Sequence, residues 1–107
     1  LVDAADYTVD LANHDFLDDI QSVARVATSS SFTGKTSTNG VADANDVTLT
    51  SVTGDQSEAL VIYQHTGTEG TSRLIAYIDT ATGLPVTPNG NDITIQWDNG
   101  ANKIFKL

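Results

Sequence analysis

Four apolar runs decide the fold of this chain: ALVIY at residues 59–63, LIAYI at 74–78, DITIQW at 92–97 and KIFKL at 103–107. Each run is rich in β-branched or aromatic residues, and each is bounded by glycine- and asparagine-rich turns, as is typical of short strands. The runs at 59–63 and 74–78 are apolar on both faces, so we predict central strands that are covered on each side. The loop between them is compatible with antiparallel pairing.

The rest of the chain adds weaker strand signals and one helix. Asp46–Val52 alternates, Ser22–Thr28 is a strand of moderate strength, and Ser29–Asn45 is either a long loop or two edge strands joined near Asn39-Gly40. Residues 14–20 form the one plausible short helix, with Asn13 as its cap. Asn99-Gly100 predicts a tight hairpin, with Ile95 opposite Ile104 and Gln96 opposite Lys103.

With about seven or eight short strands, residues 1–107 are expected to form a single all-β domain, an antiparallel β-sandwich or jelly-roll-like fold. A barrel is the other architecture that this spacing allows. The chain begins Leu1-Val2-Asp3, which resembles the end of a strand whose start lies upstream. We therefore expect the N-terminal strand or arm to be truncated.

Composition excludes several classes of function. The 107 residues carry 14 acidic and 5 basic side chains, for a net charge of −9, and no cysteine. Such a chain repels nucleic acid and anionic membranes, because both require lysine and arginine. Without cysteine there are no disulfides and no thiolate chemistry. A small domain without disulfide cross-links often gains stability by association, so we expect a homo-oligomer.

The histidines and acidic pairs offer candidate sites, but none reaches a catalytic or metal-binding pattern. His14 and Asp18 stand four residues apart on the expected helix, yet two ligands do not make a metal site. The preferred interpretation is a solvated helix face, and His65 is interpreted as the end of a strand. The remaining acidic candidates are Asp43-Ala44-Asn45-Asp46 for calcium, and Asp18-Asp19 and Asp55 with Glu58 as paired carboxylates.

No catalytic, cofactor-binding or metal-binding residue is assigned, and the chain is expected not to be an enzyme. Ser29–Ser31 lack a nucleophile elbow, and Gly67–Gly70 lacks the lysine of a phosphate loop. Calcium at Asp43–Asp46 stays an open alternative. Tyr63, Tyr77 and Trp97 are a possible carbohydrate-stacking platform, although alternating strand positions favour core aromatics.

Three segments resemble small structural proteins encoded in tailed-bacteriophage genomes and prophages: Ser57–Tyr63, Leu74–Gly90 and Trp97–Leu107. The likeness continues more weakly through Asp15–Ile20 and Arg25–Thr28. Members of that group begin further upstream, with a short basic segment that leads into a strand. The resemblance implies a virion protein, and no functional residue can be carried over, because the shared motifs are strand and turn residues.

From these observations we expect a capsid decoration or cement protein that binds the major capsid protein and neighbouring copies of itself on the phage particle. A tail or head–tail junction protein is the alternative within the same structural class. A carbohydrate-binding β module is the alternative from another class. The sequence separates neither head from tail nor one oligomeric symmetry from another.

Overall fold

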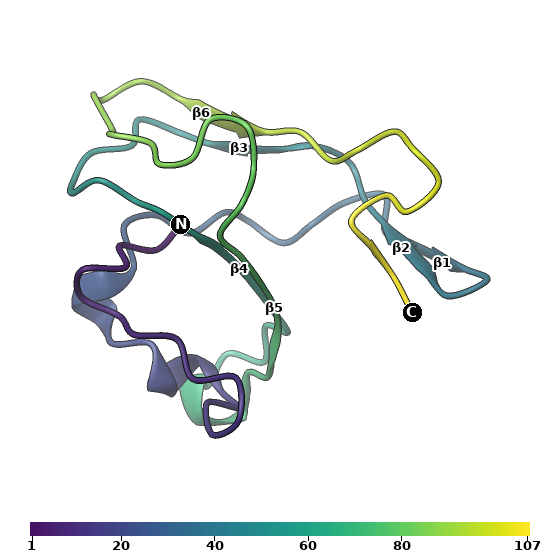
Figure 1. Cartoon of the computed structure of the whole chain (residues 1–107), viewed down its shortest axis with the longest axis horizontal. Coiled ribbons are helices and arrows are strands. Elements are labelled where there is room, and N and C mark those ends of the chain that lie inside the picture. Colours follow the sequence, from purple (N-terminus) through teal and green to yellow (C-terminus); the bar gives the residue numbers. More distant parts are fainter.

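The computed structural model describes all residues from Leu1 to Leu107, in seven short strands and three 3₁₀ helices (Figure 1). The strands are β1 (Thr36–Thr38), β2 (Val41–Asp43), β3 (Val47–Leu49), β4 (Leu60–Tyr63), β5 (Leu74–Ile78), β6 (Ile93–Ile95) and β7 (Phe105–Lys106). The helices are η1 (Leu17–Asp19), η2 (Ser22–Ala24) and η3 (Glu69–Thr71). The chain is therefore rich in strands, as predicted.

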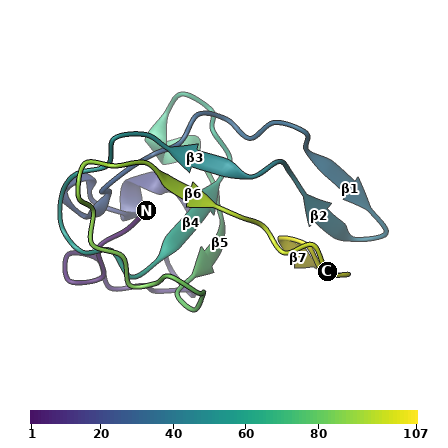
Figure 2. The ribbon, with the colours of Figure 1, turned by 90° about the horizontal axis from the view of Figure 1, so that it is seen from above.

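The strands form three separate antiparallel sheets, in the orders β1-β2-β7, β3-β6 and β4-β5. The β3-β6 pair lies above the β4-β5 pair when the molecule is viewed from the side, and the two pairs overlap when it is viewed from above (Figures 1 and 2). The sheet β1-β2-β7 lies to one side of both pairs. The sheets do not close into a barrel.

The antiparallel pairing of the two most apolar runs is confirmed. In the β4-β5 ladder Val61 pairs with Tyr77 and Leu60 with Ile78, and an irregularity between Ile62 and Tyr63 shifts the register. The prediction that both strands are central was wrong, because each has only one neighbour and Ile75 keeps 52% of its surface exposed. Continuous apolar runs thus mark a small two-stranded sheet whose second face is only partly covered.

The Ser/Thr-rich middle segment forms two strands, of which β1 is an edge strand as expected, whereas β2 lies between β1 and β7. β1 and β2 form a two-residue hairpin around Asn39 and Gly40, whose φ angles are 53° and 78°. Positive φ at both central positions is the type I′ turn that the right-handed strand twist favours. Asn39 tolerates that conformation better than most residues and Gly40 adopts it without a steric penalty.

The predicted hairpin at Asn99-Gly100 does not form. Ile95 pairs with Val47 of β3, Phe105 pairs with Ala42 of β2, and Gly100 lacks the positive φ that a type I′ turn requires. In place of one local pairing, the chain makes two long-range ones. As a result β6 lies beside buried Leu49, while β7 extends the β1-β2 hairpin.

Two N-terminal predictions also need correction. The segment from Ser22 to Thr28 is not a strand: it begins as η2, and only Arg25 forms a bridge, with Val2. The helix expected over residues 14–20 is reduced to the three residues of η1, and Asn13 does not cap it. The first turn is held instead by Asp19, whose Oδ2 accepts hydrogen bonds from the backbone N–H groups of Asp15 and Phe16.

The core is small, and the N-terminal segment supplies its buried residues. Val2, Tyr7, Ile20 and Ala24 are buried, and half-buried Val61, Leu74 and Tyr77 pack against them. Only 11 of 107 residues are buried, and the accessible surface is 6776 Å². A folded monomer of 11.3 kDa exposes about 5,700 Å² by the usual scaling with mass. The molecule therefore exposes roughly 1,000 Å² more than a typical monomer of its size.

One part of the molecule is a projection that we call the arm, residues 35–43 and 103–107, which contains β1, β2 and β7. Figure 2 shows it extending away from the remaining sheets. Every residue of β1 is exposed, and no residue of β2 or β7 is buried. β1 and β7 are both edge strands with unpaired outer edges. None of the helices in the molecule has the length and apolar character of a membrane span.

Candidate functional site

The two histidines have structural neighbours and no common site. The Tyr7 hydroxyl and His14 Nδ1 lie 2.9 Å apart in a hydrogen bond, and the two rings pack with centroids 5.5 Å apart. The rings of His65 and Tyr63 pack in a T-shaped arrangement with centroids 6.5 Å apart. Burial raises the pKa of Tyr7, so its hydroxyl stays protonated at neutral pH. The His14–Asp18 spacing does not produce a metal-binding group.

The possible calcium ligands at Asp43–Asp46 have other partners within the chain. Asp46 Oδ1 accepts a hydrogen bond from the backbone N–H of Trp97 at 2.9 Å, and Asn45 Nδ2 donates to Thr33 Oγ1 at 3.0 Å. Asp43 Oδ2 lies 3.9 Å from Lys103 Nζ. These contacts fix the place where the arm joins the rest of the molecule, which gives the segment a structural role.

The structure brings together one acidic group that the sequence does not indicate. Carboxylate oxygens of Asp3, Asp6 and Asp55 lie within 4.8 Å of one another. Asp3 is buried and Oδ1 accepts the backbone N–H of Ala5 at 2.7 Å. No sequence motif could have revealed this group, because Asp55 is far from the other two in the chain.

In each pair of carboxylates considered for glycoside hydrolysis, one member accepts hydrogen bonds from backbone N–H groups and the other does not. Glu58 Oε2 accepts the backbone N–H of Ala4 at 2.9 Å, whereas its proposed partner Asp55 belongs to the acidic group around Asp3. Asp19 caps the first turn of η1, while Asp18 is exposed beside it. Both pairs are thus divided between different structural roles.

The three aromatic residues considered for carbohydrate stacking are half-buried and have different ring partners. Tyr77 packs against Tyr7, Tyr63 against His65, and Trp97 against Phe32 with ring centroids 5.5 Å apart. Trp97 also donates its indole N–H to the carbonyl of Asn45 at 3.2 Å. The rings are therefore mainly packing residues, and Trp97 connects the body of the molecule to the root of the arm.

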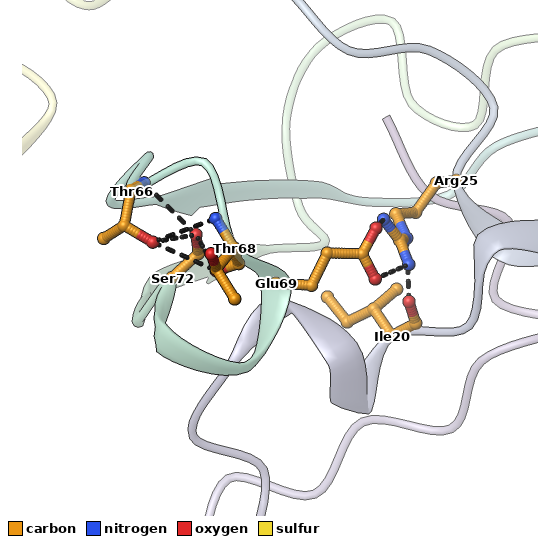
Figure 3. A network of polar contacts seen from close by, with 6 residues as sticks. All are labelled: Ile20, Arg25, Thr66, Thr68, Glu69 and Ser72. Carbon is orange, nitrogen blue, oxygen red and sulfur yellow. Dashed lines mark hydrogen bonds and ion pairs between the residues drawn. The ribbon is translucent and has the colours of Figure 1, made fainter.

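A network of polar contacts holds the loop between β4 and β5 (Figure 3). Arg25 binds both carboxylate oxygens of Glu69, at 2.8 and 3.0 Å, and its Nε donates to the carbonyl of Ile20. Beside this ion pair, the buried Ser72 hydroxyl donates to the carbonyl of Thr68 and lies 3.0 Å from Thr66 Oγ1. These contacts fix the loop to the N-terminal segment.

Acidification is expected to weaken these contacts. Hydrogen bonding to Arg25 lowers the pKa of Glu69, and the N–H groups of Phe16 and Asp15 lower the pKa of Asp19. A depressed pKa in the folded state contributes stability that is present at neutral pH and is lost as the pH falls below about 4.5. Thermal unfolding across the range pH 7 to pH 2.5 should therefore show a falling midpoint on the acid side.

The matched control is the double variant Glu69→Gln with Asp19→Asn. It should be less stable at pH 7, and its unfolding midpoint should change less with pH than that of the unmodified chain. If the two acid profiles have the same slope, these two carboxylates do not cause the pH dependence.

The surface with the clearest distinguishing features is the arm. It carries Lys35, Lys103 and Lys106, which are all the lysines of the chain, against one acidic residue, Asp43. Its outer backbone edges are unpaired, and unpaired edges are templates for pairing with another chain. Sequence reasoning missed this surface, because it assigned the run 103–107 to a hairpin with 92–97.

The chain matches no protein-family model and no curated protein. The geometry of the arm and of the body must therefore support any functional assignment.

Proposed function

We propose that this chain is a structural protein of a tailed-bacteriophage particle, and specifically a decoration or cement protein on the outer surface of the capsid. It would bind the major capsid protein and neighbouring copies of itself. The single observation that supports this proposal best is the arm, a projecting sheet with two unpaired edges on a domain with a small core. The resemblance of Ser57–Leu107 to phage structural proteins points in the same direction.

The surface area supports a role in assembly. The molecule exposes roughly 1,000 Å² more than the scaling for its mass, and one side of a standard interface covers about 800 Å². A partner that covered the arm would therefore bring the exposed surface close to that of an ordinary monomer. This is the behaviour expected of a subunit that completes its packing on a particle.

We propose that the β3-β6 pair and the β4-β5 pair are the two layers of a reduced antiparallel β-sandwich of jelly-roll type. Leu49 and Ile95 of one pair and Leu60 and Ile62 of the other line a common cavity of about 60 Å³, which supports this assignment. Each layer has only two strands, so strands from a neighbouring subunit could extend either one.

The charge of the chain suits a position outside the shell. With a net charge of −9 it would not compete for the packaged nucleic acid, whose binding requires cationic side chains. We propose a binding role for the chain and no catalytic one. The proposed protein therefore acts through its surfaces.

The test is cosedimentation of the purified full-length protein with expanded capsids that lack it, with bound copies counted by calibrated gel densitometry. We expect saturation at hundreds of copies per particle, because a decoration protein repeats with the shell lattice. Decorated capsids should also withstand heating better than bare ones, since binding to the assembled shell stabilises it. An absence of binding would exclude the cement role.

The arm also supports a second role, in the tail or at the head–tail junction. Ring-forming and tube-forming proteins contact their neighbours through projecting hairpins, and β1-β2 is such a hairpin. Saturation of the same capsids at a dozen copies or fewer would favour this role. A carbohydrate-binding role requires aromatic rings on one exposed face, whereas Tyr63, Tyr77 and Trp97 are half-buried and each packs against another ring.

A further inference from the structure

Charge is divided unequally between the arm and the rest of the molecule, which we call the body. The arm has three lysines and one aspartate, for a net charge of +2, which leaves −11 for the body. The only basic side chains of the body already have partners. Arg25 is paired with Glu69, and the guanidinium of Arg73 lies 4.9 Å from the ring centroid of Phe16. A cationic arm and an anionic body are complementary surfaces.

The body carries an open cavity of about 250 Å³ between the loop of residues 7–15 and strand β5. Only five large hydrophobic residues of the chain are exposed, and three of them line this cavity: Val9, Leu11 and Ile75. Solvent-exposed apolar groups that gather at one cavity are typical of a binding surface.

Acidic side chains lie among these apolar residues. Asp10 and Asp15 both line the cavity, together with one basic residue, Arg73, whose guanidinium lies over the Phe16 ring. Both oxygens of Asp10 are occupied by hydrogen bonds from residues 12 and 13 of its own loop. The carboxylate of Asp15 accepts no hydrogen bond within the chain and is exposed, so it is available to a cation.

The outer edge of β7 has the complementary character. Leu107, another of the five exposed hydrophobics, keeps 95% of its surface accessible and follows the exposed Lys106. β7 pairs with β2 on one side only, so its other edge has free backbone donors and acceptors. An apolar side chain beside a lysine thus stands on the arm, and a mixed cavity with exposed apolar side chains beside an aspartate lies on the body.

We propose that copies of this chain associate head to tail, with the β7 edge of one copy docked in the cavity beside β5 of the next. Leu107 then packs among Leu11 and Ile75, and Lys106 faces Asp15. In Figure 1 the arm extends away from the loop of residues 7–15, so the contact joins two copies. A contact between two different surfaces generates a ring if its rotation closes and a filament if it does not.

This inference deepens the proposed function, because it names the surfaces through which neighbouring subunits meet. It is tested without capsids, by sedimentation velocity of the full-length protein over a range of concentrations. The unmodified chain should form species larger than a monomer at high concentration. Lys106→Glu and Asp15→Lys should each weaken association at least about tenfold, since each puts like charges opposite one another.

The two variants mixed in equal amounts should associate again, because the acidic arm of one then meets the basic cavity of the other. Lys35→Glu is the matched control. It makes the same change in net charge on the same sheet, but at the β1 edge, and should leave association nearly unchanged at physiological salt, where charges are screened beyond about 8 Å. Leu107→Ser should weaken association without any change of charge.

An unmodified chain that stays monomeric at every concentration would overturn the proposal, and so would a Lys35→Glu variant that associates as weakly as Lys106→Glu. A third contrary result is a mixture of Lys106→Glu and Asp15→Lys that does not associate, although both variants unfold as cooperatively as the unmodified chain. Capsid binding by Lys106→Glu is a separate measurement. A variant that binds capsids but does not self-associate separates the two proposals, and a chain that self-associates but never binds capsids removes only the virion role.

Discussion

Replacing Ile20 by alanine is expected to lower the free energy of unfolding by about 3 kcal/mol. Ile20 is 1% exposed and lies at the centre of the core with Val2, Tyr7 and Ala24. The substitution removes buried apolar surface and leaves a cavity in a core with few other members. Because domains of this size are stable by only about 5–15 kcal/mol, a large part of the total would be lost.

Urea unfolding followed by far-UV circular dichroism measures the effect, and Val23→Ala is the matched control. Val23 is three residues further along the chain and keeps 63% of its surface exposed, so its truncation should change stability by less than about 0.5 kcal/mol. Equal losses for the two variants would mean that the core is not centred on Ile20. The slope of the unfolding curve should stay the same for both, since the fold itself is retained.

Replacing Trp97 by alanine is expected to release the arm while the body stays folded. Trp97 makes two side-chain contacts beside the arm, ring packing on Phe32 and the indole hydrogen bond to Asn45, whereas its backbone hydrogen bond to Asp46 is kept in the alanine variant. Loss of a half-buried ring at such a site costs about 2 kcal/mol, less than the 3–5 kcal/mol of a fully buried one. This loss of stability should affect only the local opening of the arm and not the unfolding of the other sheets.

Amide hydrogen exchange measures the effect residue by residue. The amides of β2 and β7 should exchange about 30-fold faster in Trp97→Ala, as expected for a local loss of about 2 kcal/mol, whereas those of β4 and β5 should be unaffected. Trp97→Phe keeps the ring contact and loses only the indole donor, so it should show a smaller change. Equally accelerated exchange in all strands would show that Trp97 supports the whole fold and not the arm.

Local sequence patterns correctly predicted the strands whose pairing is also local. The runs at 59–63 and 74–78 pair with each other, and Asn39-Gly40 forms the hairpin turn that its residue types favour. In both cases the chain that separates the two partners is short, so turn chemistry and apolar periodicity contain most of the information.

Long-range pairing explains the main errors. The run at 92–97 pairs with β3 and the run at 103–107 with β2, more than forty residues away in each case, so the turn residues Asn99-Gly100 lose their expected role. The Ser22–Thr28 segment has strand-forming residues, but η2 and the Arg25–Glu69 ion pair give it another conformation. Tertiary contacts decide the conformation of such segments, and residue propensity alone does not predict those contacts.

The candidate surfaces were the least predictable part. The lysines of the arm are separated by up to 71 residues, and the cavity beside β5 combines that strand with a loop near the N-terminus. Their complementarity appears only when the strands are placed in space. The isolated histidines and acidic pairs, by contrast, were visible in the sequence, and His14, Asp19 and Glu58 make hydrogen bonds within the fold.

The small core has a consequence for the turnover of the protein. With 11 buried residues, a free subunit depends on few contacts, so it should open often and be cut readily by proteases. A subunit whose arm and cavity are both occupied gains stability in proportion to the strength of those contacts. Free copies would thus be degraded first, and the surviving population would consist of those copies whose arm and cavity are occupied.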